Sequence, residues 1–184
     1  MSTSPKTLKQ RLFLGFAPDE SQRRQLQALQ RELQHRQTTP QGWRPVLKDN
    51  LHLTLAFLGG CSPEQRRELE LGIGQIHKPR FAQRLERLQL WRGPGVLCLG
   101  EHAEDDGLLQ LYRDSQTLAG KLGLQQSEHG FHPHITLFRK AKAGQLPTLS
   151  PEPLTLKPEQ LHLYWSESTP SGVRYRILHS WDLG

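Results

Sequence analysis

Apolar and polar residues alternate in two short segments of the chain, a pattern typical of strands that bury one face. The first segment, residues 51–57, reads Leu-His-Leu-Thr-Leu-Ala-Phe, and the second, residues 134–138, reads His-Ile-Thr-Leu-Phe. Each segment therefore predicts a strand that presents polar side chains on one face and feeds a core with the other. Apolar runs elsewhere predict further strands at residues 11–17, 81–90, 96–100, 154–156, 161–165 and 175–181.

Three other segments predict helices from recognisable start signals, and in the first and third of them leucines recur at helical spacing. Asp19 is followed three residues later by Gln22, and Ser62 by Gln65, which is the spacing of a capping box. The third helix is predicted after the acidic residues 104–106, because the helix dipole favours negative charge at its start. The resulting order of strands and helices places one helix before each motif strand. The two halves therefore look like a loose internal duplication, and a pseudo-twofold axis would make the motif strands face each other across a groove.

The composition indicates a folded protein with an anionic partner. The 184 residues suffice for one domain, or two small lobes that share a core, and the formal charge of +6 favours nucleic acid as the partner. Residues 12–17 are too short for a secretory signal, and no apolar run approaches the length of a transmembrane helix. Cys61 and Cys98 give no disulfide framework. We expect a cytoplasmic protein that is a monomer and does not associate with a membrane.

The two predicted motif strands share the sequence His-x-Thr-Leu, beginning at His52 and at His134. An unperturbed imidazole titrates near pH 6.5, so a pair of histidines can take a proton from a nucleophile and give one to a leaving group at about neutral pH. Thr54 and Thr136 place a hydroxyl on the same face as each ring. Phosphodiester cleavage needs this exchange of protons.

The motifs allow two other interpretations. A histidine and a threonine on a half-buried strand can be its solvated face, although the recurrence of the pattern in two strands argues against this for the pair. Zinc or iron would need a third ligand at close spacing. Glu128, His129 and His132 lie near the second motif, but nothing with ligand spacing accompanies either one. We therefore expect no metal and no other cofactor.

In their local sequence, Asn50–Gly59 and Phe131–Arg139, the two motifs resemble the signature strands of the 2H phosphoesterases. The resemblance is to the bacterial and archaeal RNA 2',3'-cyclic phosphodiesterases, once called 2'-5' RNA ligases, and it covers nearly the whole chain. It implies an α+β fold, residues 1–184 forming a single bilobal domain of two pseudo-symmetric antiparallel sheets with flanking helices around a central groove. It also implies a reaction without metal or nucleotide cofactor.

The resemblance also implies roles for individual residues. His52 and His134 would be the acid/base pair, and Thr54 and Thr136 would donate hydrogen bonds to the non-bridging phosphate oxygens, where the transition state concentrates charge. Arg139, five residues after the second histidine, would help to hold the phosphate.

Phe57 holds the same position after the first histidine and would lie near the nucleobase. By strict alternation this fifth position falls on the face opposite the histidine, so Phe57 and Arg139 reach the groove only if the strand bends, bulges or ends first. Core packing is the alternative for Phe57, and an ordinary surface charge is the alternative for Arg139. Further candidates for contacts with bases and phosphates flank the motifs: Trp43, Arg44, Lys48, Phe131 and His132.

The expected reaction is hydrolysis of an RNA-terminal 2',3'-cyclic phosphate to a 2'-phosphomonoester. One histidine takes a proton from the attacking water, and the other gives a proton to the departing 3'-oxygen. We expect His134 as the base and His52 as the acid, an order that the sequence does not decide. In reverse, the same groove would join the cyclic phosphate to a 5'-hydroxyl with a 2'-5' linkage. The alternatives are an RNA-end binding module without chemistry, or a phosphodiesterase for small cyclic nucleotides or 2'-5' oligonucleotides.

Overall fold

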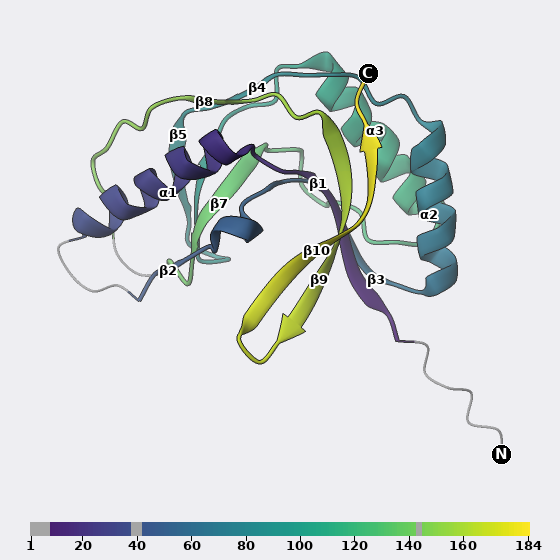
Figure 1. The fold of residues 1–184 in the computed structure, drawn as a ribbon, viewed down its shortest axis with the longest axis horizontal. Helices are drawn as coiled ribbons and strands as arrows, with labels where there is room; N and C mark the ends of the chain where they lie inside the picture. The colour runs from purple at the N-terminus through teal and green to yellow at the C-terminus, as the bar shows by residue number, and fades with distance from the viewer. Residues whose placement is uncertain (1–7, 38–41, 143–144) are drawn as a thin grey trace.

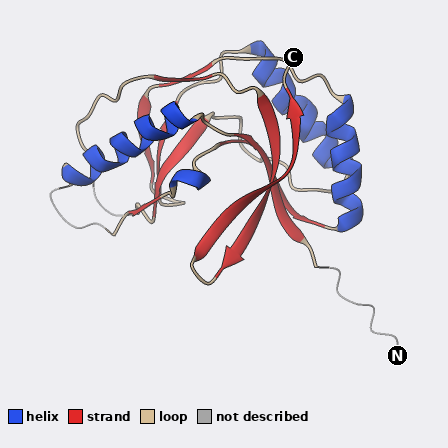
Figure 2. Cartoon of the chain, in the orientation of Figure 1, coloured by secondary structure: helices blue, strands red, loops and turns tan. Residues whose placement is uncertain are grey.

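The computed structural model describes residues 8–37, 42–142 and 145–184, which form three α-helices, one 3-10 helix and ten strands (Figures 1 and 2). The helices are α1 (Glu20–His35), α2 (Pro63–Gln75) and α3 (Asp106–Lys121), and the 3-10 helix η1 is Lys48–Asn50. The strands are β1 (Gln10–Phe16), β2 (Arg44–Pro45), β3 (Leu53–Cys61), β4 (Gln83–Leu85), β5 (Arg87–Trp91), β6 (Val96–Gly100), β7 (His134–Arg139), β8 (Leu154–Leu156), β9 (Gln160–Thr169) and β10 (Gly172–Asp182). Of these, β3 and β7 are the two motif strands.

The first two helices begin at the capping boxes that the sequence predicts. The Asp19 carboxylate accepts a hydrogen bond from the Gln22 backbone at 2.8 Å, and the Gln22 side chain accepts one from the Asp19 backbone at 2.9 Å. Ser62 and Gln65 form the same reciprocal pair at 3.1 and 3.0 Å. Both boxes satisfy donors that a helix N-terminus leaves open. No helix of the described ranges combines the length and the apolar character that crossing a membrane would take.

An antiparallel sheet with the strand order β10-β9-β1-β3-β7-β6-β5 forms the centre of the fold, and β2 pairs with the outer part of β7. Helices α2 and α3 pack against the half that contains β3, and α1 covers the half that contains β7 (Figure 1). The two halves meet where Leu53 of β3 lies opposite Ile135 of β7. A separate two-stranded sheet is formed by β4 and β8. The predicted α+β architecture with antiparallel sheets and flanking helices is confirmed.

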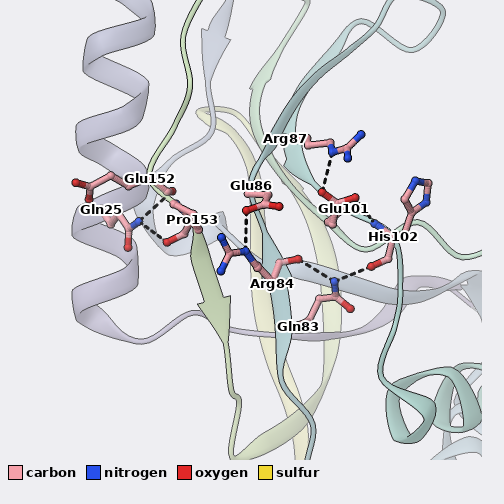
Figure 3. A network of polar contacts seen from close by, with 9 residues as sticks. All are labelled: Gln25, Gln83, Arg84, Glu86, Arg87, Glu101, His102, Glu152 and Pro153. Carbon is pink, nitrogen blue, oxygen red and sulfur yellow. Dashed lines mark hydrogen bonds and ion pairs between the residues drawn. The ribbon is translucent and has the colours of Figure 1, made fainter.

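The strand predicted at 81–90 is instead two strands in different sheets, since β4 pairs with β8 and β5 pairs with β6. The side chain of Gln83, which is 3% exposed, donates hydrogen bonds to the carbonyls of Arg84 and His102 at 2.8 and 3.0 Å (Figure 3). Arg87 forms an ion pair with Glu101 at 3.0 Å just beyond the break. The contacts of Gln83 with His102 and of Arg87 with Glu101 join residues distant in the sequence and stabilise the break.

The leucine and isoleucine side chains of both motif strands lie in one continuous core between the sheet and the helices. Leu53 and Ile135, which pair across the junction, are both fully buried. Because neighbouring residues of a strand point to opposite faces, the histidine and threonine of each motif lie on the other face, away from the helices' core. The core thereby fixes the orientation of the polar residues.

Candidate active site

The junction between β3 and β7 brings the two motifs together. With Leu53 opposite Ile135 in an antiparallel pair, the register places His52 beside Thr136 and Thr54 beside His134. All four side chains therefore point to one face around a local twofold axis. The two rings are also close enough to interact electrostatically, because a charge on His134 lowers the pKa of His52.

Both motif strands have a bulge at the same motif position, and this explains how Phe57 and Arg139 reach the histidine face despite strict alternation. The register of β3 against β1 skips Leu55, and that of β7 against β6 skips Leu137, which are the third residues after the two histidines. An extra residue in one strand reverses the alternation beyond it. Phe57 and Arg139 consequently emerge on the histidine face, where Phe57 is 57% exposed, whereas both bulge leucines are buried.

Two glycines leave room beside the motifs on the flanking strands. Gly15 of β1 lies opposite Thr54, and Gly100 of β6 lies opposite His134. A Cβ atom on Gly15 would come within 2.6 Å of the Leu53 carbonyl oxygen, and one on Gly100 within 3.2 Å of the His134 Cβ. Each glycine thus permits the close approach of a motif strand to its neighbour.

His52 is 9% exposed and lies among aromatic rings. Its Nδ1 donates a hydrogen bond to the Asn50 carbonyl at 2.7 Å, because a carbonyl can only accept, and in the neutral ring Nε2 then accepts from the Thr54 hydroxyl at 2.9 Å. Phe13 and Tyr175 contact the ring with centroids 4.8 and 4.9 Å away. Burial removes water from the charged form and lowers the pKa of His52 to about 4.

His134 uses the same hydrogen bond in a more open setting. Its Nδ1 donates to the carbonyl of His132 at 2.7 Å, so Nε2 again points toward the shared face. The ring is half-buried and meets the edge of Trp91 at 4.5 Å. Burial lowers the pKa of His134, and the charges of His132 and Arg139 act in the same direction.

Strand β10 connects the two motifs from the side. The Asn50 side chain donates to the Val173 carbonyl at 2.8 Å and accepts from the Tyr175 backbone at 3.2 Å. Arg139 Nη2 donates to the Tyr175 hydroxyl at 3.3 Å. Tyr175 therefore contacts the His52 ring and the Arg139 guanidinium at once. Tyr175 is not predicted as a site residue, since nothing in its local sequence distinguishes it from other residues of a polar edge strand.

Two hollows flank this face. The first, of about 720 Å³, is lined by residues that include Phe57, Arg139 and Tyr175. The second, of about 840 Å³, is lined by residues that include Phe57, Thr54 and His134. Both volumes are within the usual range for small-ligand sites. Because Phe57 lines both hollows, it lies where they meet, beside the motif face.

The structure brings most of the flanking candidates to these hollows. Arg44 lines the first hollow, and His132 and Phe131 line the second. Trp43 is 7% exposed and packs against Phe138 in the core, with ring centroids 5.8 Å apart. The expected contact of Trp43 with RNA is therefore wrong, because its ring is buried and packs in the core against Phe138. Lys48 forms an ion pair with Glu20 at 2.5 Å.

The site offers acid/base and anion-binding groups. Two imidazoles, two hydroxyls and one guanidinium share a face, so the arrangement can remove a proton, supply a proton and hold a negatively charged oxygen. Across the described ranges, no three His, Cys, Asp or Glu side chains gather closely enough to hold a metal ion.

Comparisons with known proteins identify the family to which this chain belongs. A family model described as LigT-like phosphoesterase matches residues 16–98. The RNA 2',3'-cyclic phosphodiesterase of Escherichia coli is 38% identical over 146 residues, which are 78% of this chain and 82% of that protein. The protein of the same name from Thermus thermophilus is 31% identical over 185 residues, covering 94% and 90%. The crystal structure of E. coli LigT complexed with 3'-AMP matches with a TM-score of 0.86 and 34% identity, covering 95% of this chain and 98% of that chain. The chain belongs to the LigT-like phosphoesterases of the 2H superfamily.

Proposed function

We propose that this protein hydrolyses the 2',3'-cyclic phosphate at an RNA end to a 2'-phosphomonoester. The observation that carries the proposal is the junction of β3 and β7, where paired strands with matching bulges present two histidines and two threonines on one face. The curated relatives named RNA 2',3'-cyclic phosphodiesterases support the substrate class. The formal charge of +6 fits a polyanionic substrate.

In the proposed reaction, a water oxygen forms a bond to phosphorus and the bond between phosphorus and the 3'-oxygen breaks. One imidazole accepts the proton that the water loses, and the other donates a proton to the departing 3'-oxygen. The hydroxyls of Thr54 and Thr136 and the guanidinium of Arg139 stabilise the charge that develops on the non-bridging oxygens. Phe57, at the junction of the hollows, contacts the terminal base.

The different settings of the histidines favour His52 as the base and His134 as the acid. His52 has its pKa lowered to about 4 and accepts a hydrogen bond from Thr54 at Nε2, so it rests unprotonated with its lone pair on the site face. His134 is more exposed and takes a proton more readily. This order is the reverse of the one that we expected from the sequence.

The reaction proposed here uses no metal ion, and we place the protein in the cytoplasm as a monomer. Reversal of the same steps, with a 5'-hydroxyl in place of water, would form a 2'-5' linkage as a secondary activity. Water, at about 55 M, favours hydrolysis.

The experiment uses an oligoribonucleotide that ends in a 2',3'-cyclic phosphate, incubated with the protein in the presence and absence of EDTA. We expect a product whose phosphate maps to the 2'-oxygen, formed at the same rate in both samples. A product with a 3'-phosphate, or binding of the RNA without any product, would refute the proposal. Loss of activity in EDTA that a divalent ion restores would refute the metal-free reaction.

A further inference from the structure

We propose that the first hollow binds the phosphodiester linkages that precede the terminal nucleotide of the RNA, through Arg11, Arg44 and Lys140. This inference rests on the proposed function and extends it, because it makes the preferred substrate an RNA chain rather than a single cyclic nucleotide.

The charge of the two hollows differs sharply. The lining of the first includes the permanent cations Arg11, Arg44 and Arg139 together with Lys140, and it contains no carboxylate. The lining of the second includes neither lysine nor arginine, and it contains Glu128. Phosphate groups of a polynucleotide therefore favour the first hollow.

The cations of the first hollow are not neutralised by acidic partners. Eight ion pairs occur within the described ranges, and none of them includes a cation of this hollow. Arg139 instead donates a hydrogen bond to the neutral hydroxyl of Tyr175. The positive charge thus remains available to an anionic ligand.

A pair of arginines within the hollow also points to an anion. Arg44 of β2 lies directly opposite Arg139 of β7 in the antiparallel register, so the two side chains emerge on the same face. Like charges directly opposite each other destabilise a sheet. A phosphate between the two guanidinium groups would turn this repulsion into two charge-assisted interactions.

The position of Arg139 shows which end of the first hollow lies next to the catalytic histidines. The charge of Arg139 lowers the pKa of both His52 and His134, so this end of the hollow adjoins the reacting phosphate. Arg11 lies on β1, which is separated from β7 by β3, and Lys140 follows Arg139 in a left-handed backbone conformation with φ of 59°. A chain leaving the terminal phosphate would therefore pass cations from β1 and from the β2–β7 pair.

The test compares two substrates that share the same terminal nucleoside. One is a nucleoside 2',3'-cyclic monophosphate, which has no preceding linkage, and the other is a short oligoribonucleotide with a 2',3'-cyclic phosphate end. Arg11→Gln and Arg44→Gln should each lower kcat/KM for the oligonucleotide roughly tenfold. Arg11→Gln should leave kcat/KM for the monophosphate unchanged, and Arg44→Gln should lower it far less than tenfold, because Arg44 lies opposite Arg139, which holds the reacting phosphate. The plot of log kcat/KM against log salt should become flatter by about 0.7 for each cation removed.

Arg31→Gln is the matched control, since Arg31 is exposed on α1 and belongs to the lining of neither hollow. Equal losses on both substrates, or an unchanged salt dependence for the oligonucleotide, would overturn the inference. Anisotropy of a fluorescent oligonucleotide with a 3'-phosphate measures the same contacts without turnover. If the wild type hydrolyses neither substrate, the proposed function fails. The binding measurement still tests the hollow in that case: Arg11→Gln and Arg44→Gln should weaken oligonucleotide binding, and Arg31→Gln should not.

Discussion

The two motif strands have the same His-x-Thr-Leu sequence and the same bulge, yet they hold their histidines in different surroundings. His52 is 9% exposed and enclosed by the rings of Phe13 and Tyr175, whereas His134 is half-buried against Trp91. In both rings Nδ1 donates to the carbonyl two residues earlier, so Nε2 faces the site. The motif thus sets the direction of each ring, and the neighbouring strands set how readily it takes a proton.

This difference explains how a nearly symmetric pair can support an asymmetric reaction. The proposed hydrolysis of a cyclic phosphate needs one neutral and one protonated imidazole at the same moment. Stronger desolvation of His52 makes the form with the proton on His134 the more populated of the two singly protonated forms. In the proposed mechanism, packing around identical motifs therefore assigns the base and the acid.

The largest expected effect follows from removing either imidazole. His52→Ala and His134→Ala should each lower kcat by roughly two to four orders of magnitude, because each removes one proton transfer. The double variant should lose little more than the worse single variant, since the two groups act as one unit. His77→Ala, at an exposed site outside both hollows, is the control. Turnover near the wild-type rate by either single variant would show that its ring takes no part.

A substrate with sulfur in place of the departing 3'-oxygen distinguishes the acid from the base. A thiolate leaves without a proton, so this substrate should restore roughly a hundredfold of the activity lost by His134→Ala. It should restore almost none of the activity lost by His52→Ala, because water must still be deprotonated. Rescue of His52→Ala instead would return the roles to the order expected from the sequence.

Replacing the two threonines should have similar effects on rate but different effects on the pH dependence of the rate. Thr54→Val and Thr136→Val should each lower kcat roughly tenfold to a hundredfold, since each removes a donor to a phosphate oxygen. Thr54 also donates to Nε2 of His52, which favours the neutral ring. The acid limb of the pH–rate profile should therefore move to higher pH in Thr54→Val and stay in place in Thr136→Val. Identical pH profiles for the two variants would contradict the hydrogen bond in the free enzyme.

The smallest expected effect concerns stability in acid. The pKa of His52 is about 4 in the folded protein and near 6.5 in an unfolded chain, so the unfolded state binds more protons between these values. The free energy of unfolding should consequently fall as the pH falls through this window, by about 2 kcal/mol between pH 7 and pH 5. Urea unfolding at the two pH values measures the change. His52→Gln, which cannot titrate, should have the flatter dependence, and an equal fall in both proteins would show that His52 is not the cause.

Much of the fold and the paired histidines could be predicted because they depend on local patterns. The capping boxes at Asp19 and Ser62 place α1 and α2, and alternation places His52 and His134 on strand faces opposite the core. The bulges could not be placed in this way. A buried Leu137 fits a regular strand and a bulged strand equally well, and the register against a distant strand decides between them.

The residues that the sequence missed come from strands remote in the chain. Tyr175 reaches His52 and Arg139 from β10, and Arg11 reaches the first hollow from β1. Trp43 shows the opposite error, since an aromatic residue before a motif reads as a base contact until its packing against Phe138 is known. Tertiary contacts decide each of these cases, and the local sequence does not contain them.

The central claim is that both imidazoles contact one phosphate, and ring-nitrogen NMR of histidine-labelled protein tests it most directly. The protein is titrated with a nucleoside 2'-monophosphate, and the Nε2 resonances of His52 and His134 are followed. We predict that both resonances shift with the same saturating concentration and that the pKa of both rings rises, because a bound anion favours the imidazolium form. A shift of one ring alone, or saturation of the two rings at different concentrations, would contradict the account.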